Sequence, residues 1–317
     1  IEQINIELNK YKNFEKIVIS LIPVGYEGDR LLKIFQKYDC YLIHIVWGYM
    51  PNDDLQLFQK IKKRMNFNYT PKNLLRKFNL KLGLTKRRNY DLVFFAGKNT
   101  FQRARKLSNL QEKIHLIDYD NYLKFKKSKK RNFCVFLDQA YTCHSDDLLS
   151  GNKKKIHMNY YKSLDTFFSK IEKKFKLKVK IALHPKNYLS KKYFFGRSSY
   201  MGNTAKLVSQ SQFVFCHTSL SISYAVLNFK PLIFLNSKVF NDYSENGEDV
   251  RIAKILSNYL GCEFLNIDEF SVKNNLNLTV NKTLYKKYKY NYIIAKDKEG
   301  ITSRDIFIKK LKNLTLR

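Results

Sequence analysis

Two apolar segments in the second half of the chain end in side chains that can bind phosphate. Ile181–Leu183 ends in His184-Pro185, and Phe213–Cys216 ends in His217-Thr218-Ser219. An imidazole and hydroxyls donate hydrogen bonds to phosphate oxygens. In a parallel sheet flanked by helices, ligands bind at the carboxyl ends of the strands. We therefore expect these residues at the ligand-binding edge of a sheet.

His184 and the Thr218-Ser219 pair are expected to act on one ligand. Pro185 restricts the backbone of His184. The Thr218-Ser219 pair precedes an expected helix over Leu220–Asn228, with Ser221 in its first turn. The N–H groups and the dipole of that helix would attract an anion. The alternative is that the hydroxyls of Thr218, Ser219 or Ser221 only cap the helix. The two strands are consecutive in the predicted sheet, and adjacent parallel strands lie about 4.8 Å apart, so both ends reach one ligand.

A carboxylate is expected at the same edge. Asp138 follows the apolar strand Asn132–Leu137. A partly desolvated carboxylate there serves as a general base or as a nucleophile, and the alternative is a helix cap. His144, Asp146 and Asp147 lie nearby, but their spacing is not that of a metal site.

The composition limits the class of partner. The 317 residues include 59 Lys and Arg against 27 Asp and Glu, a formal net charge of +32. Such a charge favours an anionic membrane surface, an anionic substrate or nucleic acid. The abundance of Lys, Asn and Ile also fits the bias of an AT-rich genome. Nucleic acid is disfavoured because the chain has no zinc-finger, RNP, KH or basic-zipper signature.

Several other classes are excluded by the sequence. No apolar run approaches the roughly 18 residues of a transmembrane helix, and the charged start is unlike a signal peptide. The five cysteines are odd in number and lack C-x-x-C spacing, so we expect reduced, buried thiols of a cytosolic protein and no zinc. The chain has no glycine-rich nucleotide motif, and Gly25–Asp29 is only a permissive turn.

Strands and helices alternate along the whole chain, which predicts parallel sheets in an α/β fold. In the first half we expect a buried strand at Lys16–Pro23, further strands at Cys40–Trp47, Tyr90–Phe95 and Ile114–Ile117, and helices at Asp29–Tyr38 and Asp54–Met65. In the second half we expect strands at Asn132–Leu137, Leu177–Leu183, Phe213–Cys216, Leu232–Leu235 and Cys262–Ile267, and helices at Met158–Phe175, Tyr200–Ser211, Leu220–Asn228, Glu248–Leu260 and Ser303–Leu314.

The basic run Lys124–Arg131 has no apolar periodicity and is a candidate linker between the halves. We therefore expect doubly wound domains at 1–128 and 129–300 with a ligand cleft between them. A C-terminal helix over 301–317 is expected to pack back on the first domain.

The ordered set of motifs resembles a known family. A strand ending in His-Pro, a later strand ending in Ser/Thr-Ser and an acidic residue at an earlier strand end look like the bacterial GT-B sialyltransferases and the related Kdo and nonulosonic acid transferases. There the His-Pro histidine and the Ser/Thr-Ser pair bind the phosphate of a CMP-sugar, and His184-Pro185 and Thr218-Ser219 match them. The acidic motif there is Asp/Glu-Asp/Glu-Gly, whereas this chain has Asp138-Gln139-Ala140. The resemblance covers about residues 132–240.

The resemblance implies a GT-B-like fold of two Rossmann-like domains facing a central cleft. Residues 1–128 would bind the acceptor and 129–300 the CMP-sugar. The implied reaction moves a sialic acid-type nonulosonic acid or Kdo to a glycan or glycolipid acceptor in surface polysaccharide biosynthesis, without metal or cofactor. The basic surface suits a cytoplasmic enzyme at the inner face of the cytoplasmic membrane, with no nucleic acid partner.

The roles implied for the site residues follow from the same resemblance. His184 and the donor-binding residues Pro185, Thr218, Ser219 and Ser221 hold and stabilise the leaving phosphate. Asp138 is the base of an inverting reaction or the nucleophile of a retaining one, and the sequence leaves both open.

Two other interpretations stay open. Another GT-B enzyme, such as a UDP-sugar epimerase or a phosphotransferase with a CDP-polyol donor, shares the fold and a strand-end histidine. A non-enzymatic basic module for nucleic acid or anionic polysaccharide would bind in a salt-sensitive manner without nucleotide preference. It would also tolerate the loss of His184.

Overall fold

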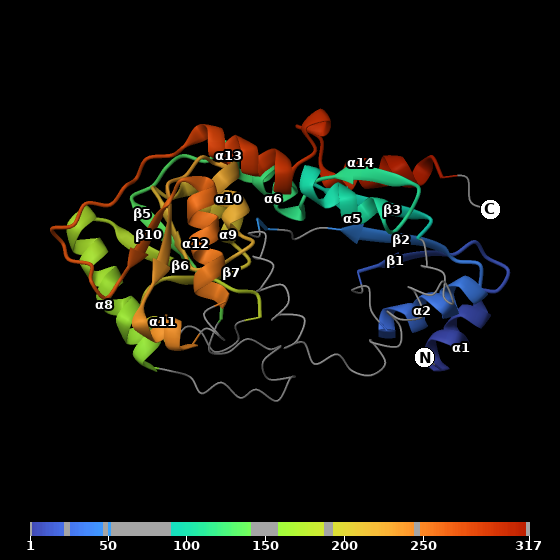
Figure 1. The fold of residues 1–317 in the computed structure, drawn as a ribbon, viewed down its shortest axis with the longest axis horizontal. Coiled ribbons are helices and arrows are strands. Elements are labelled where there is room, and N and C mark those ends of the chain that lie inside the picture. The colour runs from blue at the N-terminus through green and yellow to red at the C-terminus, as the bar shows by residue number, and fades with distance from the viewer. Residues whose placement is uncertain are drawn as a thin grey trace, which may run out of the picture. The chain divides into compact units, whose positions relative to one another are not determined.

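The computed structural model describes residues 2–21, 26–46, 50–51, 90–140, 158–186, 193–243 and 248–314. The chain divides into two compact units. Unit 1 contains Ile1–Tyr49, Asp53–Leu116 and Ile294–Arg317, and unit 2 contains Met50–Asn52 and Ile117–Ile293. Each unit is built on its own parallel sheet covered by helices (Figure 1). The expected α/β class with parallel sheets in two units is thereby confirmed. The doubly wound strand order expected for both domains is found, among the described strands, in unit 2 alone.

Unit 1 has four parallel strands in chain order: β1 (Ile17–Ser20), β2 (Tyr41–Val46), β3 (Leu92–Ala96) and β4 (Gln111–Ile114). Its helices are α1 (Glu2–Lys10), α2 (Tyr26–Lys37), α5 (Phe101–Arg105) and α14 (Ser303–Lys312), with 3-10 turns at Lys98–Thr100 and Lys296–Lys298. All five residues of β3 are buried. Phe95 packs in a cluster with Leu32 of α2 and Ala104 of α5, while Phe94 contacts Phe307 of α14 with ring centroids 4.9 Å apart.

Two expectations for unit 1 change, and a third is untested. The strand expected to be buried at Lys16–Pro23 is β1, which pairs with β2 in the described sheet. Its Ile17 and Ile19, which share one face of the strand, are 40% and 48% exposed. The strand expected at Ile114–Ile117 lies earlier, and Ile117 already begins a helix. The helix expected at Asp54–Met65 lies outside the described residues.

The C-terminal segment of unit 1 is fastened to the end of β4 by His115, which is fully buried. Its Nδ1 accepts a hydrogen bond from the Ala295 N–H at 3.1 Å, so Nε2 carries the proton and donates to the Lys298 carbonyl at 3.1 Å. The hydroxyl of Ser303 donates to the His115 carbonyl at 3.2 Å. Lys298 also pairs with Glu112. These bonds hold α14 in unit 1.

Unit 2 has six parallel strands in the order β10-β9-β8-β5-β6-β7. The strands are β5 (Phe133–Leu137), β6 (Lys178–Leu183), β7 (Ser199–Met201), β8 (Val214–Cys216), β9 (Leu232–Asn236) and β10 (Glu263–Asn266). The helices are α6 (Ile117–Phe125), α8 (Met158–Phe175), α9 (Thr204–Gln210), α10 (Ile222–Leu227), α11 (Lys238–Tyr243), α12 (Glu248–Leu260) and α13 (Lys282–Tyr288), followed by a π-helical turn at Lys289–Ile293. The helix expected over Tyr200–Ser211 is instead the edge strand β7 followed by α9.

Helix α8 covers one face of this sheet. Its apolar residues recur with helical spacing at Tyr161, Leu164, Phe168 and Ile171, and all are buried. They pack on alternate residues of the central strands, such as Phe136 of β5. A different group of helices, α6, α9 and α10, packs together, and the Ser223 hydroxyl of α10 donates to Asp118 of α6. Burial raises the pKa of Asp118.

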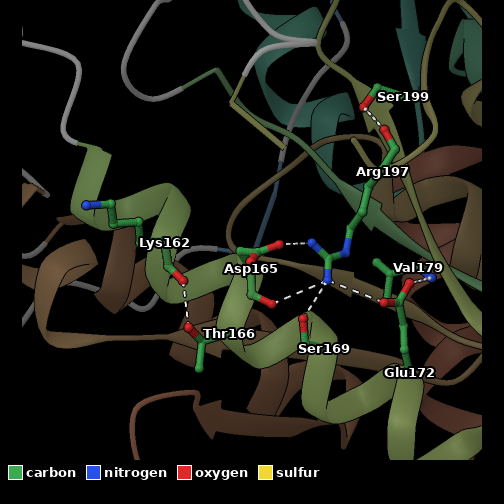
Figure 2. Close-up of polar contacts among 8 residues, drawn as sticks. All are labelled: Lys162, Asp165, Thr166, Ser169, Glu172, Val179, Arg197 and Ser199. Atoms are coloured by element: carbon green, nitrogen blue, oxygen red, sulfur yellow. Dashed lines mark hydrogen bonds and ion pairs between the residues drawn. The ribbon is translucent and has the colours of Figure 1, made fainter. Parts of the chain in front are cut away.

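An arginine network ties α8 to the segment before β7 (Figure 2). The Arg197 side chain is only 10% exposed and pairs with Asp165 and, at 3.3 Å, with Glu172. Its Nη2 also donates to the Ser169 hydroxyl at 2.9 Å. The other carboxylate oxygen of Glu172 accepts from the Val179 N–H at 2.9 Å. One guanidinium thus fixes the helix against the β6 and β7 side of the sheet.

The basic run Lys124–Arg131 does not separate the two units. It begins in the last turn of α6, and the Arg131 N–H donates to the Gln210 carbonyl of unit 2 at 2.8 Å. The division between the units falls at Leu116 and Ile117, ahead of the boundary expected at residues 128 and 129, because α6 packs against α9 and α10. None of the helices in the described ranges is long and apolar enough to cross a membrane.

Candidate functional site

The strand order of unit 2 creates a switch point. Numbered along the chain within unit 2, its strands lie in the order 3-2-1-4-5-6, which is the arrangement of doubly wound nucleotide-binding sheets. From β5 the chain first moves outward through β6 and β7, then returns to β8 on the other side. In such sheets ligands bind at the carboxyl ends of the two strands where the direction reverses. Here these strands are β5, which leads to Asp138, and β8, which leads to Thr218.

This order corrects one expectation about the site. The strands that end in His184 and Thr218 are not neighbours, because β5 lies between β6 and β8. Leu137 of β5 is in register with Ala182 of β6 and Cys216 of β8. His184 and Thr218 are therefore two strand spacings apart, about 10 Å, and Asp138-Gln139 lies between them.

Asp138 is tied to the His-Pro segment. Its side chain is buried, with 4% of the residue exposed. Oδ2 accepts a hydrogen bond from the His184 N–H at 3.3 Å, and Oδ1 accepts one from the Ala140 N–H at 3.0 Å. The carboxylate therefore orients the backbone of the strand end that bears the histidine.

Ala140 has an unusual backbone conformation. Its φ is 54°, in the left-handed region, where a residue with a Cβ is disfavoured and glycine is preferred. The chain thus bends after Asp138-Gln139 as a glycine would allow. Ala140, the third residue of the acidic segment Asp138-Gln139-Ala140, thus adopts a conformation that glycine favours.

Gln139 is a site residue that the sequence analysis missed. Its Oε1 accepts from the Thr218 N–H at 2.5 Å, and its Nε2 donates to the Thr218 hydroxyl at 2.9 Å. The amide therefore holds the turn after β8 through two bonds. Gln139 directly follows Asp138 at a strand end, which is the one signal in the sequence. Its contact with Thr218 depends on the strand order, which the sequence pattern does not reveal.

The His184 ring is oriented by the backbone that follows it. Its Nδ1 accepts a hydrogen bond from the Lys186 N–H at 3.2 Å. In the neutral ring the proton is therefore on Nε2, which is the nitrogen suited to donate to a phosphate oxygen. His184 is partly buried, whereas Pro185 is exposed.

The helix after β8 is shorter than expected. The structure has α10 over Ile222–Leu227, six residues in place of Leu220–Asn228. The Ser219 hydroxyl accepts from the Ser221 N–H at 3.2 Å, and Ser221 stands at the helix N-cap without a side-chain capping bond. Ser219 therefore shapes a turn at the switch point, and the expected helix dipole is correspondingly reduced.

His217 is a structural residue. It is fully buried, and its ring stacks on Phe240 with centroids 4.1 Å apart. Nδ1 donates to the Leu235 carbonyl at 2.8 Å, and Nε2 lies 3.1 Å from the Tyr160 hydroxyl. Because burial disfavours the imidazolium, the pKa of His217 is lowered to about 4. The ring is neutral at physiological pH.

Two further polar residues, Asn236 and Ser237, lie at the same edge of the sheet. Asn236 ends β9, and its buried Oδ1 has no hydrogen-bond partner among the described residues. Ser237 next to it caps α11, since its hydroxyl accepts from the Phe240 N–H at 3.0 Å.

The thiols of Cys40, Cys134, Cys216 and Cys262 are free, and Cys143 lies outside the described residues.

Cation-binding clusters are not found in the described parts of the chain, where no group of three or more His, Cys, Asp or Glu side chains could hold a metal ion. His144, Asp146 and Asp147 lie outside those parts. At the switch point itself the described donors are backbone N–H groups, hydroxyls, an amide and an imidazole.

Comparisons with solved structures give distant similarities of fold. The chain is similar to the spinosyn forosaminyltransferase SpnP, with 9% identity over 88% of this chain and 71% of that one and a TM-score of 0.42. It is also similar to a UDP-GlcNAc 2-epimerase from Methanocaldococcus jannaschii in complex with UDP-GlcNAc and UDP, with 14% identity, 90% and 77% coverage and a TM-score of 0.41. For MnaA of S. aureus with UDP the values are 14%, 100%, 83% and 0.42. No protein-family model and no curated protein sequence matches the chain.

Proposed function

We propose that the protein is a glycosyltransferase that moves a sialic acid-type nonulosonic acid or Kdo from a CMP-sugar to a glycan or glycolipid acceptor. One observation carries the proposal. Asp138 bonds to the His184 backbone and the adjacent Gln139 bonds to Thr218, so the three motif elements form one connected group at the carboxyl edge of a doubly wound sheet. The glycine-like turn at Ala140 adds to it.

In this proposal unit 2 binds the donor and unit 1 the acceptor. The acceptor hydroxyl attacks the anomeric carbon of the sugar, and the bond from that carbon to the phosphate oxygen breaks. Nε2–H of His184 donates to the phosphate oxygens of the departing CMP, where negative charge develops, and the hydroxyls of Thr218, Ser219 and Ser221 assist. In an inverting reaction Asp138 takes the proton of the acceptor hydroxyl. In a retaining reaction Asp138 first displaces CMP and forms a bond to the anomeric carbon. The acceptor hydroxyl then displaces Asp138, and its proton passes to the phosphate of the departed CMP.

A turnover assay separates this proposal from its alternatives. The full chain is incubated with CMP-, CDP- and UDP-linked sugars or polyols, and release of the nucleotide is measured with and without acceptor glycans. We expect release of CMP only, and its loss in His184→Ala while the fold is retained. Turnover of a UDP-sugar or a CDP-polyol instead would make the protein a different GT-B enzyme. Binding of polyanions without turnover of any donor would make it a binding module.

The reaction is placed in the cytoplasm, beside the inner face of the membrane, as part of the same proposal. A glycolipid acceptor would lie in that membrane, and the net charge of +32 suits an anionic leaflet.

A further inference from the structure

The basic run between α6 and β5 has no role in the donor site. Lys127, Lys129, Lys130 and Arg131 are all exposed and directly precede Phe133, the first residue of β5. The run therefore lies at the amino-terminal end of the central strand of unit 2. The candidate site lies at the carboxyl end of the same strand, about 17 Å away for a five-residue strand.

Hydrogen bonds bring a second basic segment to this end of the sheet. The side chain of Asn132 donates to the Lys176 carbonyl at 3.0 Å, and Phe133 is in register with Lys178 of β6. Lys176 and Lys178 are exposed. We give the name basic pole to six of the exposed cations at this end: Lys127, Lys129, Lys130, Arg131, Lys176 and Lys178.

The charge of the basic pole is not balanced by its own segments. Residues 124–132, 173–178, 210–212 and 228–231, which lie at this end, contain no aspartate or glutamate. Lys230 is buried here, and its Nζ donates to the Ser211 carbonyl at 2.6 Å. Its pKa is lowered to about 8, by burial first and then by the positive charge of Lys130. A cation inside the protein thus already responds to the positive field.

The chemistry of the basic pole favours lipid headgroups over nucleic acid. Single-stranded nucleic acid is held by stacking on exposed aromatic side chains, and none of the large hydrophobic residues exposed in the described chain belongs to these segments. Clusters of four to eight lysines and arginines attract anionic headgroups without stacking or insertion.

We propose that the basic pole of unit 2 docks the protein on an anionic lipid bilayer by electrostatic attraction alone. Because the pole and the candidate site occupy opposite ends of one sheet, the carboxyl edge stays uncovered when the pole contacts lipid. The proposal does not depend on which sugar nucleotide is the donor.

Vesicle sedimentation tests it with the full chain. The protein is mixed with vesicles of phosphatidylcholine alone, or of phosphatidylcholine with phosphatidylglycerol, at low and high salt. We expect binding only to the anionic vesicles and its loss at high salt. The triple variant Lys127→Gln, Lys129→Gln and Lys130→Gln should lower the partition coefficient about a hundredfold, since each lysine near the surface contributes about 1 kcal/mol.

A matched control removes the same charge from unit 1. Lys106, Lys309 and Lys312 are exposed there, and their change to glutamine should lower partitioning less than threefold. If both triple variants lose the same fraction of their partitioning onto anionic vesicles, binding depends on net charge alone and the proposal is overturned. The proposal is also overturned if the wild-type chain does not bind anionic vesicles. It is overturned as well if a mixed-sequence oligonucleotide binds the chain and displaces it from lipid. Thermal unfolding of both variants at the wild-type midpoint shows that they are folded.

Discussion

The carboxylate of Asp138 accepts a hydrogen bond from the backbone N–H of His184, with 3.3 Å between Oδ2 and N. The two residues end adjacent strands, β5 and β6, and the bond joins the acidic motif to the His-Pro motif. Asp138 therefore holds the histidine in addition to its proposed part in the reaction. This dual role makes its substitution informative.

Asp138→Asn should abolish transfer and also destabilise the fold. An amide offers one oxygen where the carboxylate uses two, so one of the N–H groups of Ala140 and His184 loses its acceptor. We expect the free energy of unfolding to fall by about 1–3 kcal/mol, measured by urea denaturation, and CMP affinity to fall with it. The matched control is Asp91→Asn in unit 1, where Oδ2 accepts from the Leu42 N–H at 2.7 Å. It should destabilise less, because the single amide oxygen can still accept from that one N–H, and CMP affinity should stay unchanged in the folded variant. Full transfer activity in Asp138→Asn would move the base elsewhere.

Gln139 gives a prediction about charge at the switch point. Gln139→Glu keeps an acceptor for the Thr218 N–H but places a negative charge where the phosphate is proposed to bind. We expect CMP to bind Gln139→Glu at least tenfold more weakly than Gln139→Ala, which is about 1.4 kcal/mol, and the gap should narrow at high salt. Calorimetric titration of both variants measures it. Equal affinities in the two variants would show that the phosphate lies away from Thr218.

Ala140→Gly tests the glycine-like turn. Relief of the left-handed strain, about 1–2 kcal/mol, offsets the entropic penalty of glycine and the lost methyl group, each about 0.8 kcal/mol. The substitution should change the free energy of unfolding by less than about 1 kcal/mol. At Ala182, a buried residue of β6, the same change has no strain to relieve and should be more destabilising by 1–2 kcal/mol, again about the strain energy. A larger loss at Ala140 than at Ala182 in the same urea series contradicts the assignment of the turn.

The lowered pKa of the buried His217 ring predicts that the protein loses stability in acid. Its pKa is about 4 in the folded protein and near 6.5 when unfolded, so the unfolded state takes up the proton first as the pH falls. Stability is complete above pH 6.5 and decreases between about 6.5 and 4. At pH 5 this residue should account for a loss of about 2 kcal/mol relative to pH 7. His217→Phe should be less stable at pH 7, because the Leu235 carbonyl loses its donor, yet show a smaller loss from pH 7 to pH 5. An identical pH slope in the two proteins would contradict the burial of a neutral ring.

Much of unit 2 could be predicted from the sequence, because its elements have strong patterns. The eighteen residues Met158–Phe175 repeat apolar side chains with helical spacing, and the structure has α8 at those residues. Asp138, His184 and Thr218 could be selected because each follows an apolar strand. The edge strand β7 has only three residues, too few to show a period of two, so the sequence predicts a helix there.

The arrangement of the site could not be predicted in the same way. The order in which strands pair is a property of the whole sheet, so the place of β5 between His184 and Thr218 has no local signal. The Gln139 bonds to Thr218 depend on that order. The basic run Lys124–Arg131 has no apolar periodicity, which by itself predicts a linker. Such a pattern does not indicate which part of the fold the run packs beside.

The carboxyl edge of unit 2 is proposed to bind the CMP leaving group, and nucleotide calorimetry on the full chain is the decisive test. CMP, UMP, UDP, GDP and NAD are titrated into the wild type and into His184→Ala. We predict that CMP binds in preference to the others and, at a hundred times its dissociation constant, raises the free energy of unfolding by about 2.7 kcal/mol. His184→Ala should bind CMP ten- to a hundredfold more weakly, as expected for one hydrogen bond to a charged group, about 1.5–3 kcal/mol. Equal or tighter binding of UMP or UDP, or unchanged CMP affinity in His184→Ala, would contradict the claim.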